Sequence, residues 1–259
     1  MSRPALSGPG REVAPGVHHL GDSIVNFYLI DDPAGLVLVD AGLPGHLAQL
    51  RGQLAAADHS LSDIRAVLLT HAHPDHTGLA GLLQETGAEI WVRQPDAAIL
   101  RHGPRSALRL AKPERSVLPY LLRRPAAAAV PLHLARNGAF TAPKVPHVRT
   151  FSADQLLEEV PGSPQAVAVG GHTQGSTAYL FAGRSLLFTG DALVTHDGLT
   201  GYTGPTLVCR GFTHDSAAAL AALDRLDGLN AAVLLPGHGQ PFTAGPRAAA
   251  QQAREAGLR

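Results

Sequence analysis

The chain has one cysteine, one tryptophan and one methionine among its 259 residues. The lone cysteine, Cys209, excludes an intramolecular disulfide framework and fits a reducing compartment, so we expect a cytoplasmic protein. No apolar run approaches the roughly 20 residues that a membrane helix needs. Residues 1–16 are rich in proline and glycine and lack the apolar core of a signal peptide.

Charged side chains are also scarce, at 16% of residues, and the formal net charge is zero. A chain without a charge excess has no general attraction for nucleic acid or for an anionic membrane. The partner that we expect is therefore a small-molecule substrate, with no nucleic acid and no membrane, and a homodimer is left open. Hydrophobic residues make up 45% of the chain, enough for a sizeable core, and we expect a single domain over residues 1–259.

Alternating apolar patterns predict strands and helices in two β-rich halves. Strands are expected at 24–30, 36–39, 64–69 and 89–92 in the first half, and at 165–170, 176–181, 185–189 and 231–235 in the second. Helices are expected at 46–57, 77–86, 95–100, 214–226 and 246–256. Turn residues 31–35 join two of the strands as a hairpin.

Residues 101–149 differ in character from both halves. They contain ten lysine or arginine residues, one acid (Glu114) and seven prolines, which divide the segment into short pieces. Short helices are predicted at 106–111 and 117–124. We interpret the segment as a basic, proline-rich helical insertion. It is either a lid that attracts an anionic substrate, through Arg105 and Arg109, or a solvated surface that balances an acidic remainder.

The stretch from Thr70 to Gly78 carries the strongest chemical signal. His71, His73, Asp75 and His76 fall within six residues, directly after the apolar run 66–69. Two imidazoles at positions i and i+2 after a strand can hold one metal ion, and the adjacent carboxylate and imidazole can turn toward a second. Imidazole suits zinc, iron, copper and nickel, and a carboxylate extends the choice toward harder ions.

Three later candidates have the same layout of strand and then loop. His172, Asp191 and His238 each follow an apolar strand, and each is preceded by a glycine, which lets the backbone bend sharply and approach closely. Each is weak evidence alone. Together, the four loops supply seven ligands, which is what a site with two metal ions demands. His196 and His214 are further candidates, for the rim of the cleft.

In these motifs and their order, the chain resembles the metallo-β-lactamase superfamily, closest to its glyoxalase II-like and lactonase-like metallohydrolases. The resemblance covers residues 17–100 and 150–245. It implies an α+β fold, a four-layer αββα sandwich with residues 101–149 inserted as a cap. The ligands that it implies are His71, His73 and His172 for the first metal, Asp75, His76 and His238 for the second, and Asp191 as the bridge. Asp191 stands where a true β-lactamase would have a cysteine, which argues against a β-lactamase, and Cys209 is interpreted as a buried small apolar residue.

The resemblance implies two divalent ions, with Zn²⁺ expected first and iron or manganese as the other choices. A hydroxide between the ions would attack an ester, lactone or thioester, and Asp75 would carry the proton. Asp40 is expected either to orient a ligating histidine or only to end its strand, and Tyr202 either to contact substrate or to pack. A longer helical C-terminal region of the glyoxalase II family is not evident, which lowers the glutathione-thioester interpretation. Two alternatives remain: an oxygenase of the persulfide dioxygenase type with one iron, and an inactive member that only binds metal.

Overall fold

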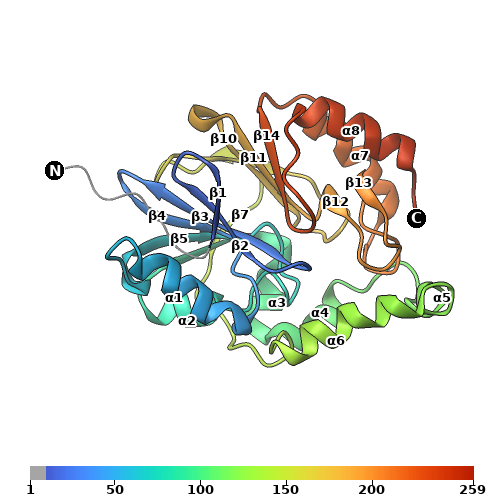
Figure 1. Ribbon diagram of the computed structural model, residues 1–259, viewed down its shortest axis with the longest axis horizontal. Helices are drawn as coiled ribbons and strands as arrows, with labels where there is room; N and C mark the ends of the chain where they lie inside the picture. Colours follow the sequence, from blue (N-terminus) through green and yellow to red (C-terminus); the bar gives the residue numbers. More distant parts are fainter. Residues whose placement is uncertain (1–9) are drawn as a thin grey trace.

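The computed structural model describes residues 10–259, and two facing β-sheets organise it (Figure 1). The first sheet has the strand order β1 (Arg11–Ala14), β2 (Val17–Gly21), β3 (Asn26–Asp32), β4 (Gly35–Val39), β5 (Ile64–Leu68), β6 (Glu89–Arg93) and β7 (Arg149–Phe151). The second has the order β14 (Val233–Pro236), β11 (Leu186–Gly190), β10 (Thr177–Phe181), β9 (Gln165–Ala168) and β8 (Gln155–Leu156), and β12 (Val194–His196) pairs with β13 (Thr203–Thr206).

The helices lie on the outer faces of the two sheets. They are α1 (Leu47–Ala55), α2 (Ala80–Glu85) and α3 (Ala97–His102) on the first sheet, and α7 (Ser216–Asp227) and α8 (Gly245–Ala256) on the second (Figure 1). The order of layers is therefore helix, sheet, sheet, helix. The αββα sandwich expected from the sequence is confirmed.

Alternation along the strands builds these layers. In β3, Phe27 and Leu29 pack outward under the helices, whereas Tyr28 and Ile30 pack inward between the sheets. In β10, Ala178 contributes to the outer core of the second sheet. Because successive side chains of a strand point to opposite faces, a strand buried on both faces reads as a continuous apolar run.

Several elements differ from the sequence prediction. The third strand begins at Asn26 and not at residue 24, because the Asp22 carboxylate accepts hydrogen bonds from the Ile24 and Val25 backbone amides in a turn. Residues 74–79 form turns, so the helix expected at 77–86 begins at Ala80. Most of the proline- and glycine-rich start, residues 1–9, lies outside the described residues, and β1 was not predicted. Within residues 10–259, no helix is both long and apolar enough to cross a membrane.

Residues 101–149, the cap, form α4 (Ala107–Leu110), α5 (Leu118–Arg123) and α6 (Ala129–Arg136) along one edge of the molecule (Figure 1). The helix α6 was not predicted from the sequence. Leu134 and Phe140 pack with Val25 and Leu43 of the first half of the chain. At the other end, a second cluster joins the cap to the second half, and it consists of Val117, Tyr120, Leu121, Ala127, Leu199, Cys209 and Phe212. The cap therefore spans both halves.

Asp22 ties the cap to the first half through two histidines. Its carboxylate lies 2.7 Å from His133 Nε2 in α6 and 2.9 Å from His46 Nε2 at the start of α1. Burial alone would raise the pKa of Asp22, but hydrogen bonds from His46 and from the Ile24 and Val25 amides outweigh burial and hold the pKa well below its usual range. The native state therefore stabilises the ionised form of this carboxyl.

Asp22→Asn is expected to lower the free energy of unfolding by roughly 1–3 kcal/mol at neutral pH, because hydrogen bonds to a charged group are lost. Since the native pKa is depressed, this stability is present above the unfolded-state pKa, about 4, and is lost as the pH falls below it. Urea unfolding of wild type and variant from pH 3 to pH 8 measures the difference. A difference that stays constant across this range would contradict the linkage.

Candidate metal centre

Four strand ends of the two sheets deliver the candidate ligands to one place. The loop at 70–78 follows β5, His172 follows β9, Asp191 follows β11, and His238 follows β14. Two of these candidate ligands, Asp191 and His238, follow a glycine that lets neighbouring loops approach closely. A Cβ on Gly190 would lie 2.2 Å from Thr70 Oγ1, and a Cβ on Gly237 would lie 2.3 Å from Asp191 Oδ1. A side chain at either position would push the loops apart.

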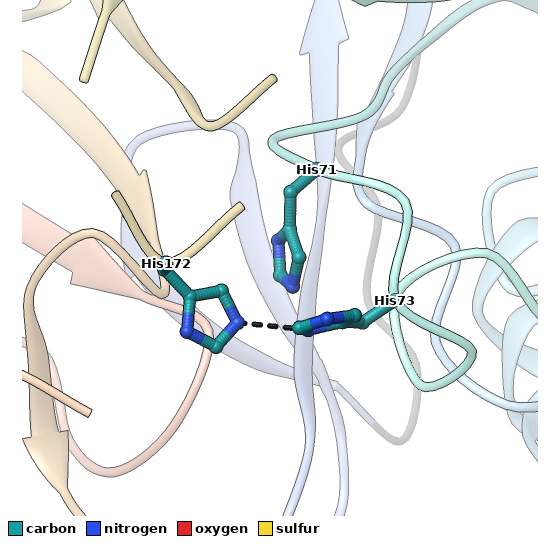
Figure 2. Close-up of side chains that lie close together, drawn as sticks. All are labelled: His71, His73 and His172. Atoms are coloured by element: carbon teal, nitrogen blue, oxygen red, sulfur yellow. Dashed lines mark hydrogen bonds between the residues drawn. The ribbon is translucent and has the colours of Figure 1, made fainter. Parts of the chain in front are cut away.

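The first group consists of His71, His73 and His172, whose rings converge from two loops (Figure 2). His172 Nε2 lies 2.8 Å from His73 Nδ1. The ring of His71 stands nearly perpendicular to the other two, with centroids 4.8 Å from His73 and 4.7 Å from His172. One nitrogen of each ring lies within 4.8 Å of the others. This spacing brings three imidazole donors around one point.

The second group consists of Asp75, His76 and His238. His76 Nε2 lies 3.6 Å from Asp75 Oδ2, and His238 Nε2 lies 3.5 Å from the same oxygen. The other nitrogen of His238 hydrogen-bonds to the Ile24 carbonyl oxygen, which orients the ring. The donor atoms of two imidazoles and one carboxylate therefore converge at a second place, where they could hold another ion.

Asp191 lies between the two groups. Its Oδ2 is 3.4 Å from His172 Nε2 and 3.1 Å from His238 Nε2, whereas its Oδ1 is 3.5 Å from His76 Nε2. Asp191 is 5% exposed, so its carboxylate is almost completely shielded from solvent. One side chain touches both groups, which is the position that the resemblance implies for a bridge.

Asp40 supports the second group from behind. It ends β4 with a positive φ of 61° and is buried. Its Oδ1 accepts from the Thr70 amide at 2.8 Å, and its Oδ2 faces His76 Nδ1 at 2.9 Å. An acceptor at Nδ1 keeps a proton on that nitrogen, so Nε2, which is turned toward the second group, is the nitrogen that can bind an ion. From this position Asp40 can orient a histidine, the first of the two roles considered for it, and that role stays a prediction.

A second supporting carboxylate, that of Asp96, was not predicted. It lies in the segment Gln94-Pro95-Asp96 before α3, whose sequence carries no motif of a metal site. Asp96 is 2% exposed and accepts from the Ala72 amide at 2.9 Å, the Gly175 amide at 2.9 Å and the Thr173 hydroxyl at 2.8 Å. Ala72 separates His71 from His73, and Thr173 follows His172. One carboxylate therefore holds together the two loops of the first group.

Asp96→Asn is expected to weaken metal binding at the first group by about 10- to 100-fold, because an amide nitrogen must face at least one of the three buried donors. Competition with a chromophoric chelator measures the affinity. Asp215→Asn is the matched control, since Asp215 accepts from the Ala218 amide at the start of α7 and asparagine caps a helix equally well. Equal affinities for the two variants would show that Asp96 does not position the loops.

Burial and charge divide the histidines into two kinds. Burial lowers the pKa of His71 and of His172 well below the usual range, and neighbouring imidazoles add to the effect. Burial would also lower the pKa of His76 and His238, but Asp191 and Asp75 outweigh it and raise these pKa values to about 10 and about 9. The raised pKa values show that the carboxylates favour a positive charge at these two positions. Bound cations would supply such a charge.

The buried donor atoms fit a metal. His71 Nε2, His76 Nε2 and Asp191 Oδ1 are buried and have no hydrogen-bond partner among the described residues. Buried polar atoms are rarely left without a partner, and an ion is one of the explanations for those that are. Imidazole nitrogens and carboxylate oxygens are the donors that zinc takes.

A cavity of about 610 Å³ opens above the two groups. His73, Asp75, His172, Asp191 and His238 form its floor. His196 also lines the cavity, whereas the side chain of His214 bonds to the Lys112 carbonyl oxygen and does not.

The three substrate contacts expected from the sequence are not among the lining residues. Arg105 is exposed and donates to the Phe140 carbonyl oxygen, Arg109 is exposed, and the Tyr202 ring packs under the Arg259 guanidinium at 3.9 Å. The helical turns of the cap direct the two arginines to solvent, and a substrate contact by any of the three residues stays a prediction. Arg115 and Arg124 line the cavity in their place, and no motif marked them.

Cys209 is fully buried in the cluster beneath the cap, as a small apolar residue would be. Burial raises the pKa of its thiol, and the nearby Asp197 carboxylate adds to this effect. A neutral, enclosed thiol is a poor metal ligand and a poor nucleophile.

The sequence of residues 20–238 matches the model of the metallo-beta-lactamase superfamily, so the chain belongs to this superfamily of metal-dependent hydrolases. It is 28% identical over 255 residues to "Probable metallo-hydrolase YflN" of Bacillus subtilis, covering 92% of this chain and 89% of the relative. It is 29% identical to "Uncharacterized protein YobT" of the same organism, over 68% of this chain and 64% of the relative.

Solved structures show the same fold. The metallo-beta-lactamase family protein TTHA1429 of Thermus thermophilus superposes with a TM-score of 0.68 at 24% identity, covering 93% of this chain and 79% of that one. BJP-1, a subclass B3 metallo-beta-lactamase of Bradyrhizobium japonicum, superposes with a TM-score of 0.62 at 20% identity, covering 95% and 91%. At these identities the likeness extends to the fold alone. The glyoxalase II-like or lactonase-like branch stays a prediction.

Proposed function

We propose that the protein is a hydrolase with two divalent metal ions that cleaves an ester, lactone or thioester. The observation that carries the proposal is the charge around the ligands. Four carboxylates, those of Asp40, Asp75, Asp96 and Asp191, are each at most 9% exposed. Among the described residues, none of them pairs with a lysine or arginine. Buried carboxylates need compensating charge, and two divalent cations would supply it.

In this proposal His71, His73 and His172 hold one ion, Asp75, His76 and His238 hold the other, and Asp191 contacts both. Ions held there would supply a nucleophile from water at neutral pH and polarise the carbonyl oxygen of the substrate. Zn²⁺ is the first candidate because imidazoles dominate the donor set, with iron and manganese as the others.

Asp75 has the second role in the proposal. Its carboxylate lies within 3.6 Å of His76 Nε2 and His238 Nε2, and it lines the cavity floor, where a substrate would bind. There, its oxygen can accept the proton of the attacking water and return it to the leaving oxygen or sulfur. The cap would exclude bulk water from this exchange.

Elemental analysis of purified protein, followed by turnover assays, tests the proposal. The substrate panel includes esters, lactones, thioesters, phosphodiesters and β-lactams, with and without chelator. Two equivalents of metal and chelator-sensitive hydrolysis of a carboxylic ester, lactone or thioester are expected. One iron per chain with oxygen consumption would replace the proposal by an oxygenase, and metal without any turnover would replace it by a binding protein.

A further inference from the structure

The cavity has two chemically different surfaces. Its floor carries the histidines and carboxylates described above, whereas the opposite wall, built by the cap and by the loop after β13, is apolar. The wall residues that matter here are Leu108, Val117, Val130, Leu134, Phe140 and Phe212. At about 610 Å³ the cavity is in the range of pockets that enclose a whole small molecule. A hydrolysable group at the floor would fill only part of it.

The basic side chains of the cap contribute little to this wall. Of its ten lysines and arginines, Arg115 and Arg124 are the two that line the cavity. The Arg124 guanidinium is engaged, since Nη1 donates to the Gly198 carbonyl oxygen at 2.8 Å. The cap therefore offers a bound substrate few polar contacts, and most of the contacts that its wall can make are apolar.

We propose that the substrate carries an extended apolar group, a chain or ring, that lies against the cap wall while the hydrolysable bond lies at the floor. This inference rests on the hydrolase function proposed above and names the substrate class. In the reaction, water adds to the acyl carbon and the acyl–oxygen or acyl–sulfur bond breaks. The carboxylic acid retains the hydroxyl, and a proton passes to the alcohol or thiol.

The mouth of the cavity is suited to such a group. Leu108 lines the cavity and is 70% exposed, so an apolar side chain borders both the interior and solvent. The two clusters that fasten the cap keep its wall in place on both sides. Leu108 and Phe140 both line the cavity, so they offer an apolar chain contacts that need no hydrogen-bond partner.

A series of substrates with growing chains tests the inference on the metal-loaded protein. One arm extends the acyl part of p-nitrophenyl esters from acetyl to decanoyl, and the other extends the alcohol of acetyl esters. We expect kcat/KM to rise roughly three- to fourfold per methylene in one arm until the cavity is filled. The arm that responds shows which side of the bond carries the apolar group. A flat profile in both arms, with hydrolysis intact, would overturn the inference and leave the proposed function standing.

Ala129 is exposed and lines the cavity at the start of α6, so Ala129→Trp, which adds a large side chain at the edge of the cavity, is the diagnostic variant. Ala135→Trp is its matched control, because Ala135 is exposed on the same helix and does not line the cavity. Ala129→Trp is expected to lower the ratio of kcat/KM for the longest ester to that for the shortest ester of the responding arm at least tenfold, and the control is expected to keep the wild-type ratio. Equal ratios in the two variants would contradict the inference.

A binding measurement separates this failure from failure of the hydrolase proposal. Titration calorimetry with two product series, carboxylates from acetate to decanoate and the alcohols of matching chain length, needs no turnover. If the protein hydrolyses nothing, chain-dependent affinity that Ala129→Trp weakens would still place an apolar ligand under the cap. Affinity that does not depend on chain length in either series would overturn the inference whatever the activity.

Discussion

Asp191→Asn is expected to reduce bound metal from the two equivalents proposed above to one or fewer, and to lower kcat/KM by about 10³. The physical reason is that Asp191 presents different oxygens to the two groups. Oδ1 faces His76, and Oδ2 faces His172 and His238. Asparagine keeps the shape but has one oxygen and no charge. Losing ion-based stabilisation of several kcal/mol corresponds to a rate loss of this order.

Metal per chain by elemental analysis and kcat/KM for the best substrate of the panel check this result together. Asp58→Asn serves as the control, because Asp58 is exposed in a turn away from the ligands. It should retain both metal and rate. A variant at position 191 that kept two ions and full activity would show that the carboxylate contacts the ions without being needed for them.

The main strands and helices could be predicted because they follow from local patterns, whereas their arrangement in four layers was implied by the resemblance to the superfamily. A run such as Leu36–Val39 is buried on both faces, and the hairpin before it is marked by Pro33 and Gly35. The edge strands were missed for the opposite reason. Arg149–Phe151 and Gln155–Leu156 are short and mostly exposed, so their sequences carry no periodicity, and they become strands only by pairing with β6 and β9.

The candidate ligands could be predicted because they lie in loops after strong strands, and parallel strands bring such loops to one edge. Asp96 could not, because its partners are backbone amides 24 and 79 residues away, and contacts of that kind leave no local pattern. The cap shows the same limit. Its charge suggested an anionic substrate, but which side chains face the cavity depends on how α4 to α6 pack, and the structure turns mainly apolar ones inward.

Residues that hydrogen-bond the candidate ligands from behind are also expected to affect metal binding, and the largest such effect is expected at Asp40. Asp40→Asn is expected to fold, since asparagine tolerates the left-handed backbone at this position, where φ is 61°. The substitution should nevertheless lower the affinity for the ion at Asp75, His76 and His238 by about 10- to 100-fold. The cause would be a change of proton position on His76 and not a change of shape.

An asparagine at position 40 has one acceptor where aspartate has two. If its oxygen keeps the Thr70 amide, its NH2 group faces His76 Nδ1, and the ring must then carry its proton on Nε2, where the ion would bind. If the amide is turned over, the NH2 group faces the buried Thr70 amide, at a cost of roughly 1–3 kcal/mol in unfolding free energy. Either arrangement loses something that aspartate supplies.

Stepwise metal titration against a chelator, together with the ¹⁵N shifts of the His76 ring, measures both effects. Asp58→Asn is a close chemical match, because Asp58 also has a left-handed backbone, with φ of 55°, but lies at the surface. We expect the two variants to differ in affinity for the second ion and to agree in affinity for the first. Should Asp40→Asn bind both ions as wild type does, Asp40 would be only the residue that ends β4, and the orientation of His76 would come from packing alone.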